Sequence, residues 1–160
     1  MSHPQHARVK LPEVARRLAS QRSLWQPLVE YDPVSRYYTR LASEHDFEAW
    51  LLSWLPGQGT EWHDHGGSAG AFVTLAGTLT EWHATVAPGR LPRPQPAPRE
   101  LPSGSLRPFG TKHVHRVTNQ GPEPAVSLHV YGPALTEMNH YRLQGQQLEL
   151  ISSERAGVSW

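Results

Sequence analysis

The sequence contains no cysteine among its 160 residues. This absence excludes disulfide bonds, a cysteine nucleophile and thiolate ligands to a metal ion. Any metal in this chain must therefore be held by histidine, aspartate or glutamate side chains. Histidine, by contrast, is abundant, with 10 residues, so the histidine pattern decides whether the sequence predicts a metal site.

Excess charge and long apolar runs are also absent. The formal net charge is +1 with histidines neutral, and lysine occurs only as Lys10 and Lys112. This balance lacks the basic surface typical of nucleic-acid-binding domains. No apolar run approaches the roughly 20 residues that a membrane-spanning helix needs, and the opening MSHPQHARVK lacks the apolar centre of a secretory signal. We therefore expect a cytoplasmic protein, a monomer, with no nucleic-acid or membrane partner.

The N-terminal part of the chain has the pattern of short helices. In LPEVARRLA, residues 11–19, apolar side chains recur at the spacing of an amphipathic helix. Pro12 suits the first turn of that helix. A second helix is expected within SLWQPLVEY, residues 23–31, broken at Pro27. The prediction is a helical segment, residues 1–34, packed on the remainder of the chain.

The chain after this segment reads as short strands. Tyr37 begins a strand-like stretch, and residues 88–102 contain six prolines, which a central strand does not tolerate. That proline-rich stretch is expected to be a loop or an extended edge connection, and QLELI near the C-terminal end is expected to close the sheet. Residues 35–160 thus predict one mainly β domain, a small antiparallel barrel or sandwich. The other expected strands lie in EAWLLSWL, TEWHDH, AGAFVTLAGTLTEWHATV, HVHRVTNQ and AVSLHVYGP.

The stretch GQGTEWHDH, residues 57–65, carries a histidine pair that favours a metal site. Residues two apart on a strand project from the same face, so His63 and His65 point together while Asp64 points away. An isolated histidine on a strand is more often structural, but this pair follows a glycine-containing turn, and later strands hold more histidines. A third ligand must come from another strand. The candidates are His113, His115 and His129.

These motifs resemble those of the cupin superfamily, and within it the cysteine dioxygenase type I family. The run G-x5-H-x-H-x4-G-x6-G, residues 57–77, is similar to the first cupin motif, with Gly70 where a typical cupin has a ligand glutamate. HRVTN, residues 115–119, is similar to the second motif. YYTR at 37–40 and PAVSLHVYGP look like further motifs of the family. The resemblance covers roughly residues 35–140 and implies a cupin fold and a thiol dioxygenase of the bacterial, arginine-containing type.

The resemblance implies that His63, His65 and His115 bind Fe(II). His113 stands at the spacing of an ordinary cupin ligand, and a role near the site is open to it. Three neutral imidazoles in place of two and a carboxylate leave the site one charge unit more positive, which favours an anionic thiolate. Gly70 is expected to leave room for the substrate. Some family members have a cysteine there that crosslinks to a tyrosine, but this chain lacks the cysteine, so its tyrosine must be an unmodified phenol.

The resemblance also implies substrate-binding residues. Arg40, at the end of YYTR, is expected to bind the substrate carboxylate, a geometry that suits a guanidinium better than an ammonium group. Tyr38 beside it is a candidate for the pocket wall. Met138 stands where a related branch acting on 3-mercaptopropionate has an arginine. The combination of Arg40 and Met138 therefore predicts L-cysteine as the substrate.

Catalytic residues are expected on the strand AVSLHVYGP. Tyr131 would point its hydroxyl at the substrate or oxygen, and His129 and Ser127 share its strand face. Such residues form a hydrogen-bonded line that orients groups and shifts their pKa. The implied reaction converts L-cysteine and O2 into cysteine sulfinate. The alternatives are another small thiol, namely 3-mercaptopropionate or cysteamine, a non-redox cupin that binds another divalent metal, and a structural barrel with incidental histidines.

Overall fold

The computed structural model describes residues 8–155, and within them short helices precede a series of strands. The helical elements are α1 (Leu11–Ser20), α2 (Arg22–Trp25) and the 3-10 helix η1 (Gln26–Leu28). The strands are β1 (Tyr37–Ser43), β2 (Glu48–Trp54), β3 (Trp62–His63), β4 (Ala69–Ala76), β5 (Thr78–Thr85), β6 (Arg93–Pro94), β7 (Arg99–Pro102), β8 (Leu106–Phe109), β9 (Val114–Thr118), β10 (Ala125–Gly132), β11 (Glu137–Gln144) and β12 (Gln147–Arg155).

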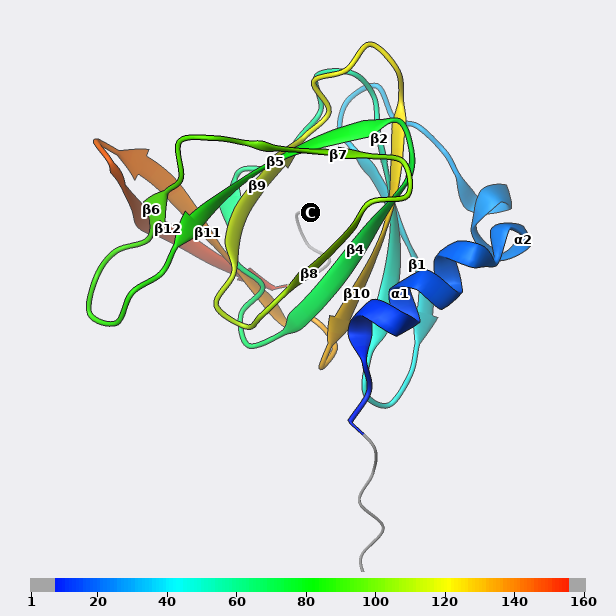
Figure 1. Cartoon of the computed structure of the whole chain (residues 1–160), viewed down its shortest axis with the longest axis horizontal. Helices are drawn as coiled ribbons and strands as arrows, with labels where there is room; N and C mark the ends of the chain where they lie inside the picture. The colour runs from blue at the N-terminus through cyan, green and yellow to red at the C-terminus, as the bar shows by residue number, and fades with distance from the viewer. Residues whose placement is uncertain (1–7, 156–160) are drawn as a thin grey trace, which may run out of the picture.

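The strands form two sheets that curl around a shared interior (Figure 1). The 5-stranded sheet has the order β1-β2-β10-β4-β8, and the 7-stranded sheet has the order β12-β11-β3-β9-β5-β6, with β7 paired to β5. All described strand pairs are antiparallel. The mainly β antiparallel barrel with a short helical N-terminal segment is therefore confirmed.

Strand β10 shows how the alternation of a strand places the site inside the barrel. Alternate side chains point to opposite faces. Leu128 and Val130 lie with apolar residues of α1 in one buried cluster, outside the barrel. Tyr131 belongs to the inner cluster, and His129 and Ser127 share its phase along the strand. Because both faces are covered, a histidine and a serine on this strand are removed from solvent.

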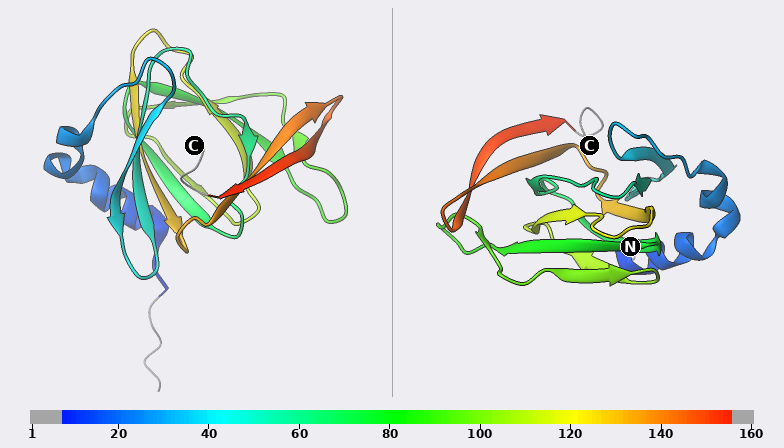
Figure 2. Two further views of the ribbon diagram at one scale, coloured as in Figure 1. Left: turned by 180° about the vertical axis from the view of Figure 1, so that it is seen from behind. Right: turned by 90° about the horizontal axis from the view of Figure 1, so that it is seen from above.

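The helices cover one side of the 5-stranded sheet. Leu11, Val14, Ala15 and Leu18 are the buried residues of α1, so the predicted amphipathic helix is confirmed. They pack on β4 and β10, on the side of the barrel away from the β11–β12 hairpin (Figures 1 and 2). The second helix is shorter than predicted, because the chain passes from α2 into η1 around Pro27. The division into segments 1–34 and 35–160 stays a prediction.

Two further regions refine the predicted strands. The proline-rich residues 88–102 form the short strands β6 and β7 beside β5, so the extended edge connection is confirmed. Strand β3 ends at His63, so His65 lies beyond the strand in which it was expected. QLELI lies in β12, which pairs with β11 at one end of the 7-stranded sheet. The Leu148 N–H of β12 also donates to the carbonyl oxygen of Pro92, next to β6 at the other end of that sheet, at 2.8 Å. None of the described helices is long and apolar enough to span a membrane.

Candidate metal centre

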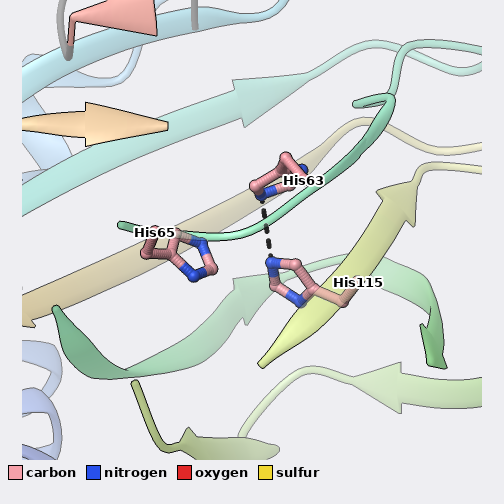
Figure 3. A group of neighbouring side chains, drawn as sticks. All are labelled: His63, His65 and His115. Atoms are coloured by element: carbon pink, nitrogen blue, oxygen red, sulfur yellow. Dashed lines mark hydrogen bonds between the residues drawn. The ribbon is translucent and has the colours of Figure 1, made fainter. Parts of the chain in front are cut away.

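Three histidines converge inside the barrel (Figure 3). His63 ends β3, His65 follows two residues later, and His115 lies in β9 directly opposite His63 in the antiparallel pairing. All three side chains are buried, and one ring nitrogen from each lies within 4.8 Å of the others. The Nε2 atoms of His63 and His115 are 3.1 Å apart. The fold thus brings together the three histidines that the sequence analysis expects as metal ligands.

Hydrogen bonds to two of these rings leave their Nε2 atoms free for a metal. His63 Nδ1 lies 2.8 Å from the carbonyl oxygen of Glu61, and His115 Nδ1 lies 2.8 Å from Glu81 Oε2. Because both oxygens are acceptors, each Nδ1 carries the proton and each Nε2 keeps its lone pair. Nδ1 of His65 is buried without a hydrogen-bond partner among the described residues. Buried imidazole lone pairs at this separation fit a divalent transition metal such as Fe(II).

Burial keeps these imidazoles in the neutral form that binds metals. Desolvation lowers the pKa of His63 and of His65 well below the ordinary histidine value, and the neighbouring His115 lowers both further. Burial also lowers the pKa of His115, although its hydrogen bond to Glu81 acts in the opposite direction. Protons and metal ions compete for the same lone pairs. A cluster that resists protonation therefore stays available to a metal.

Asp64 holds the loop that carries the histidine pair. Its carboxylate points toward β11 and away from the cluster, although Asp64 lies just past the end of β3. Its Oδ1 accepts hydrogen bonds from the Gly66 backbone N–H at 2.9 Å and from Asn139 Nδ2 at 2.8 Å. Its Oδ2 accepts one from the Tyr141 hydroxyl at 2.7 Å. Asp64 therefore ties the turn after His63 to β11 and fixes the direction in which the chain continues.

Glu81 of β5 is a residue of the site that the sequence analysis missed. It is fully buried and accepts hydrogen bonds from His115 Nδ1 at 2.8 Å and from Arg107 Nε at 2.6 Å. Burial alone would raise the pKa of Glu81, but the hydrogen bonds from the histidines and Arg107 hold it well below its usual value. The sequence does contain an indication of this role. Glu81 is a charged residue two positions after the apolar Leu79, so both side chains point to the same buried face of a strand.

His113, the rival candidate for the third ligand, lies beside this carboxylate. Its Nε2 is 3.4 Å from Glu81 Oε2, and its ring stacks on Phe109 with centroids 5.2 Å apart. It also forms a second cluster of possible ligand atoms with Glu81 and His115. Arg107 pairs with Glu81 in that cluster, which opposes a second cation there. His113 thus lies next to the three-histidine cluster without being part of it.

The space at Gly70 is filled, so our expectation of room for the substrate there is wrong. A Cβ atom added at Gly70 would lie 2.6 Å from the carbonyl oxygen of Val130 and would overlap the ring of Phe109. Phe109 also stacks on His65, with centroids 4.6 Å apart. An aromatic wall therefore occupies the position from which a typical cupin glutamate would reach the metal. Tyr131 pairs with Gly70 across the two strands, as the resemblance implied for the crosslinking pair.

A cavity of about 20 Å³ lies against the cluster. The three histidines line it, together with three residues that the sequence analysis expects at the site: Tyr131, His129 and Met138. Burial raises the pKa of Tyr131 above its usual value, so this side chain is a protonated phenol. These three residues are therefore placed where a small ligand of the metal centre would meet them.

Arg40 and Tyr38 lie farther out than the other expected residues. Neither lines the cavity. The Arg40 side chain is exposed, and its guanidinium lies over the ring of Trp50 at 5.9 Å from the centroid. Tyr38 contacts the same indole edge to face, with centroids 6.0 Å apart. Both residues therefore belong to a group around Trp50 on the two adjacent strands β1 and β2.

A hydrogen-bonded line runs from Trp54 through Ser127 to His129, and its Ser127–His129 part belongs to the line expected toward Tyr131. The Trp54 indole Nε1–H donates to Ser127 Oγ at 2.9 Å, and Ser127 Oγ lies 2.7 Å from His129 Nε2. Burial lowers the pKa of His129 to about 3, so its ring is neutral at ordinary pH. The ring stacks on Phe72, with centroids 4.9 Å apart. His129 is thereby held in one orientation along the cavity wall.

Arg36 is the second residue that the sequence analysis missed. It lines the cavity beside His63 and Tyr131, although it precedes β1. Burial lowers the pKa of its guanidinium to about 10. Its position in the sequence did indicate a place near the site. Arg36 lies two residues before Tyr38 and four before Arg40, so on an extended chain its side chain points to the same face as theirs.

Three solved structures with this fold are distant from this chain in sequence. A protein from Thermus thermophilus is 23% identical with a TM-score of 0.56, covering 68% of this chain and 93% of that chain. A Klebsiella pneumoniae protein described as having a double-stranded β-helix domain is 17% identical with a TM-score of 0.53, covering 79% and 93%. A sugar phosphate isomerase of the cupin superfamily from Silicibacter pomeroyi is 16% identical with a TM-score of 0.55, covering 79% and 80%. These likenesses confirm the cupin fold.

The family is shown by the sequence itself. No curated protein matches the chain. Residues 5–144, which include the three histidines and the wall of the cavity, match the family described as cysteine dioxygenase type I. The chain therefore belongs to the cysteine dioxygenase type I family.

Proposed function

We propose that this protein is a thiol dioxygenase that oxidises L-cysteine with O2 to cysteine sulfinate. One observation carries the proposal: the buried cluster of His63, His65 and His115 has no carboxylate from the position of Gly70, in a chain of the cysteine dioxygenase type I family. A centre of three neutral ligands favours an anionic thiolate more than a centre that includes a carboxylate. The chemistry of the donor set therefore agrees with that of the family.

The three histidines are proposed to hold Fe(II). When bound there, the metal would bring thiol and O2 together and supply the redox chemistry of their reaction. Glu81 keeps the His115 ring oriented through the Nδ1–H hydrogen bond. Phe109 packs against His65 and excludes water from that side. The chain thus contributes a neutral, preoriented and partly dry site.

Tyr131 and His129 are proposed as the catalytic residues of the cavity wall. The Tyr131 phenol keeps its proton, because burial raises its pKa, so it can donate a hydrogen bond to a substrate or oxygen atom in the cavity. His129 is neutral and is held by Ser127. A neutral imidazole lining the cavity can take part in a hydrogen bond without adding charge to the site.

Arg40, Tyr38 and Met138 are proposed to bind the substrate. Met138 is buried and presents a thioether to the cavity. Arg40 and Tyr38 lie around Trp50, outside the cavity lining. We propose that the Arg40 guanidinium contacts the carboxylate of L-cysteine from this outer position, which would make the carboxylate part of substrate selection.

Oxygen uptake with three thiols tests the function. Protein purified without oxygen and loaded with Fe(II) is given L-cysteine, 3-mercaptopropionate or cysteamine, and the product is identified by mass. We expect uptake with L-cysteine, one O2 for each sulfinate formed. Uptake with another thiol alone would retain the dioxygenase and change the substrate. No uptake with any thiol, with iron bound, would refute the proposed activity.

A further inference from the structure

Two hollows of different character adjoin the histidine cluster. The outer hollow has a volume of about 380 Å³, and its lining includes the charged residues Arg36, Glu61 and Glu154. A second hollow, which we call the apolar groove, has a volume of about 630 Å³ and lies between the start of α1 and the end of β8. The apolar side chains that line the groove are Val9, Leu11, Pro12, Ala69, Pro108 and Phe109. The outer hollow therefore suits a charged ligand, and the groove suits an apolar one.

The charged side chains at the groove leave its buried part apolar. Arg8, Lys10 and Glu13 line the groove, but all three are exposed, and Lys10 Nζ lies 3.6 Å from Glu13 Oε1. The buried side chains of the lining are those of Leu11 and Phe109. Apolar cavities in proteins stay dry and bind small apolar molecules such as xenon. O2 is a molecule of the same class.

Phe109 connects the apolar groove with the histidine cluster. Its ring lines the groove and stacks on His65, with centroids 4.6 Å apart. The ring of Tyr131, which lines the inner cavity, lies 6.3 Å from the ring of Phe109 between centroids. Gly70 also lines the groove and adds no side chain to this wall. The barrier between the groove and the cluster is therefore mainly one aromatic ring.

The position of Phe109 in the chain favours brief movements of its ring. Phe109 is the last residue of β8, a strand of 4 residues at one end of the 5-stranded sheet. Gly110 follows it, and a Cβ atom added there would meet nothing within 4 Å. Strand ends at the edge of a sheet open locally more readily than the centre of the sheet. A brief displacement of the ring joins the groove to the cluster while the barrel stays folded.

The inner cavity is too small for two reactants to enter by the same way. Its volume of about 20 Å³ holds about one water molecule. A thiol whose sulfur lies at the cluster fills this space. The remainder of that thiol lies in the outer hollow, which shares His63 and Met138 with the inner cavity. O2 that arrives after the thiol therefore needs another way to the cluster.

We propose that the apolar groove collects O2 and delivers it to the histidine cluster past Phe109, while the thiol enters from the outer hollow. The inference rests on the proposed function and deepens it, because it gives the second reactant a route of its own. A zwitterionic thiol loses hydration in an apolar groove without a compensating partner. O2 carries no charge to pair with the side chains of the outer hollow. The two hollows thus separate the reactants by polarity.

Xenon binding tests the groove without turnover. Amide NMR spectra of the zinc-loaded protein are recorded under increasing xenon pressure, and we expect the shifts to concentrate at Ala69, Phe109 and Gly110. In Gly110→Phe the added ring fills the groove, so these shifts should disappear. Gly110→Ala adds only a methyl group and should retain most of them. A native protein without xenon-dependent shifts at the groove would overturn the proposal.

Oxygen kinetics of the Fe(II)-loaded protein test the route. Gly110→Phe should lower kcat/KM for O2 about 10-fold, because access is slowed, and should leave KM for L-cysteine at saturating O2 unchanged. Gly110→Ala should lose less. Val86→Phe controls for the added ring, since Val86 is exposed and lines neither hollow.

Two kinetic outcomes would refute the route. They are an equal loss for both reactants in Gly110→Phe, and unchanged O2 kinetics in this variant once it no longer binds xenon. The proposed function would stand in both cases, because the protein still oxidises the thiol. It fails separately: a native protein that binds xenon in the groove and takes up no O2 with any thiol would refute the oxidation and support only a groove for small apolar molecules.

Discussion

Glu81 brings a carboxylate to the centre without reaching the metal position itself. It accepts the Nδ1–H of His115 at 2.8 Å, and Arg107 balances its charge from the other side at 2.6 Å. At position 70, where a typical cupin has a ligand glutamate, the ring of Phe109 fills the space. The negative charge of Glu81 therefore acts on the centre through the His115 imidazole, and the three histidines themselves stay neutral.

Replacing His115 and His113 in turn tests which residue is the third ligand. His115→Ala removes one of the three clustered nitrogens, so its affinity for Fe(II) should fall more than about 100-fold, beyond the usual effect of losing an outer partner. His113→Ala leaves the cluster intact and should retain metal and turnover. Metal content after gel filtration and O2 uptake measure both. The assignment is wrong if His113→Ala loses the metal and His115→Ala keeps it.

Glu81→Gln should weaken metal binding while leaving the fold intact. Glutamine keeps the size of the side chain but loses the charge, so the Nδ1–H of His115 is held less firmly. We expect about 10- to 100-fold lower affinity for Fe(II), measured by competition with a chelator. Glu100→Gln is the control, since Glu100 is an exposed carboxylate on the neighbouring strand β7. Equal metal affinity in the two variants would mean that Glu81 does not contribute to metal binding.

At the scale of elements, strand β4 depends on a glycine where it passes the centre. A side chain at Gly70 would meet the Val130 carbonyl oxygen and the Phe109 ring. Gly70→Ala should therefore lower the free energy of unfolding by about 1–3 kcal/mol through overpacking. Gly67→Ala is its matched control, because nothing lies within 4 Å of the added Cβ. Urea unfolding measures both variants, and equal stabilities would mean that Phe109 moves aside freely.

The pairing of secondary-structure elements also determines which residues of this site can be predicted from the sequence. The pairing of His63 with His65 is local, two residues apart, and the resemblance supplied His115, so the cluster was predictable. The contact of Glu81 with His115 depends on the antiparallel register of β5 and β9, in which His83 is opposite His115. Arg36 and Phe109 likewise meet the centre through elements distant in the sequence. No local pattern determines which of these residues face one another.

On the scale of the whole molecule, the buried neutral histidines make stability depend on pH. The pKa of His129 falls from 6.5 to about 3 on folding because of burial. Between these values the unfolded chain binds more protons than the folded one, so the free energy of unfolding decreases as the pH falls from 6.5 towards 3. Such a group contributes a slope of up to about 1.4 kcal/mol per pH unit. His63, His65 and His115 shift in the same direction.

We therefore expect the metal-free protein to lose thermal stability as it is acidified through this range. His129→Gln should reduce the slope by about one proton. His45→Gln is the control, because His45 is an exposed histidine outside the site. The midpoint of thermal unfolding, followed by circular dichroism over a series of pH values, gives the slopes. The same pH dependence in His129→Gln and the native protein would mean that folding does not lower the pKa of His129.

The proposed function is that a centre of three histidines in this barrel oxidises a thiol with O2. The most direct measurement supplies isotope-labelled dioxygen to the Fe(II)-loaded protein with L-cysteine and analyses the product by mass spectrometry. We predict cysteine sulfinate with both new oxygen atoms from labelled O2, and no such product from His115→Ala. Unlabelled oxygen in the sulfinate, or equal product from His115→Ala, would contradict the claim.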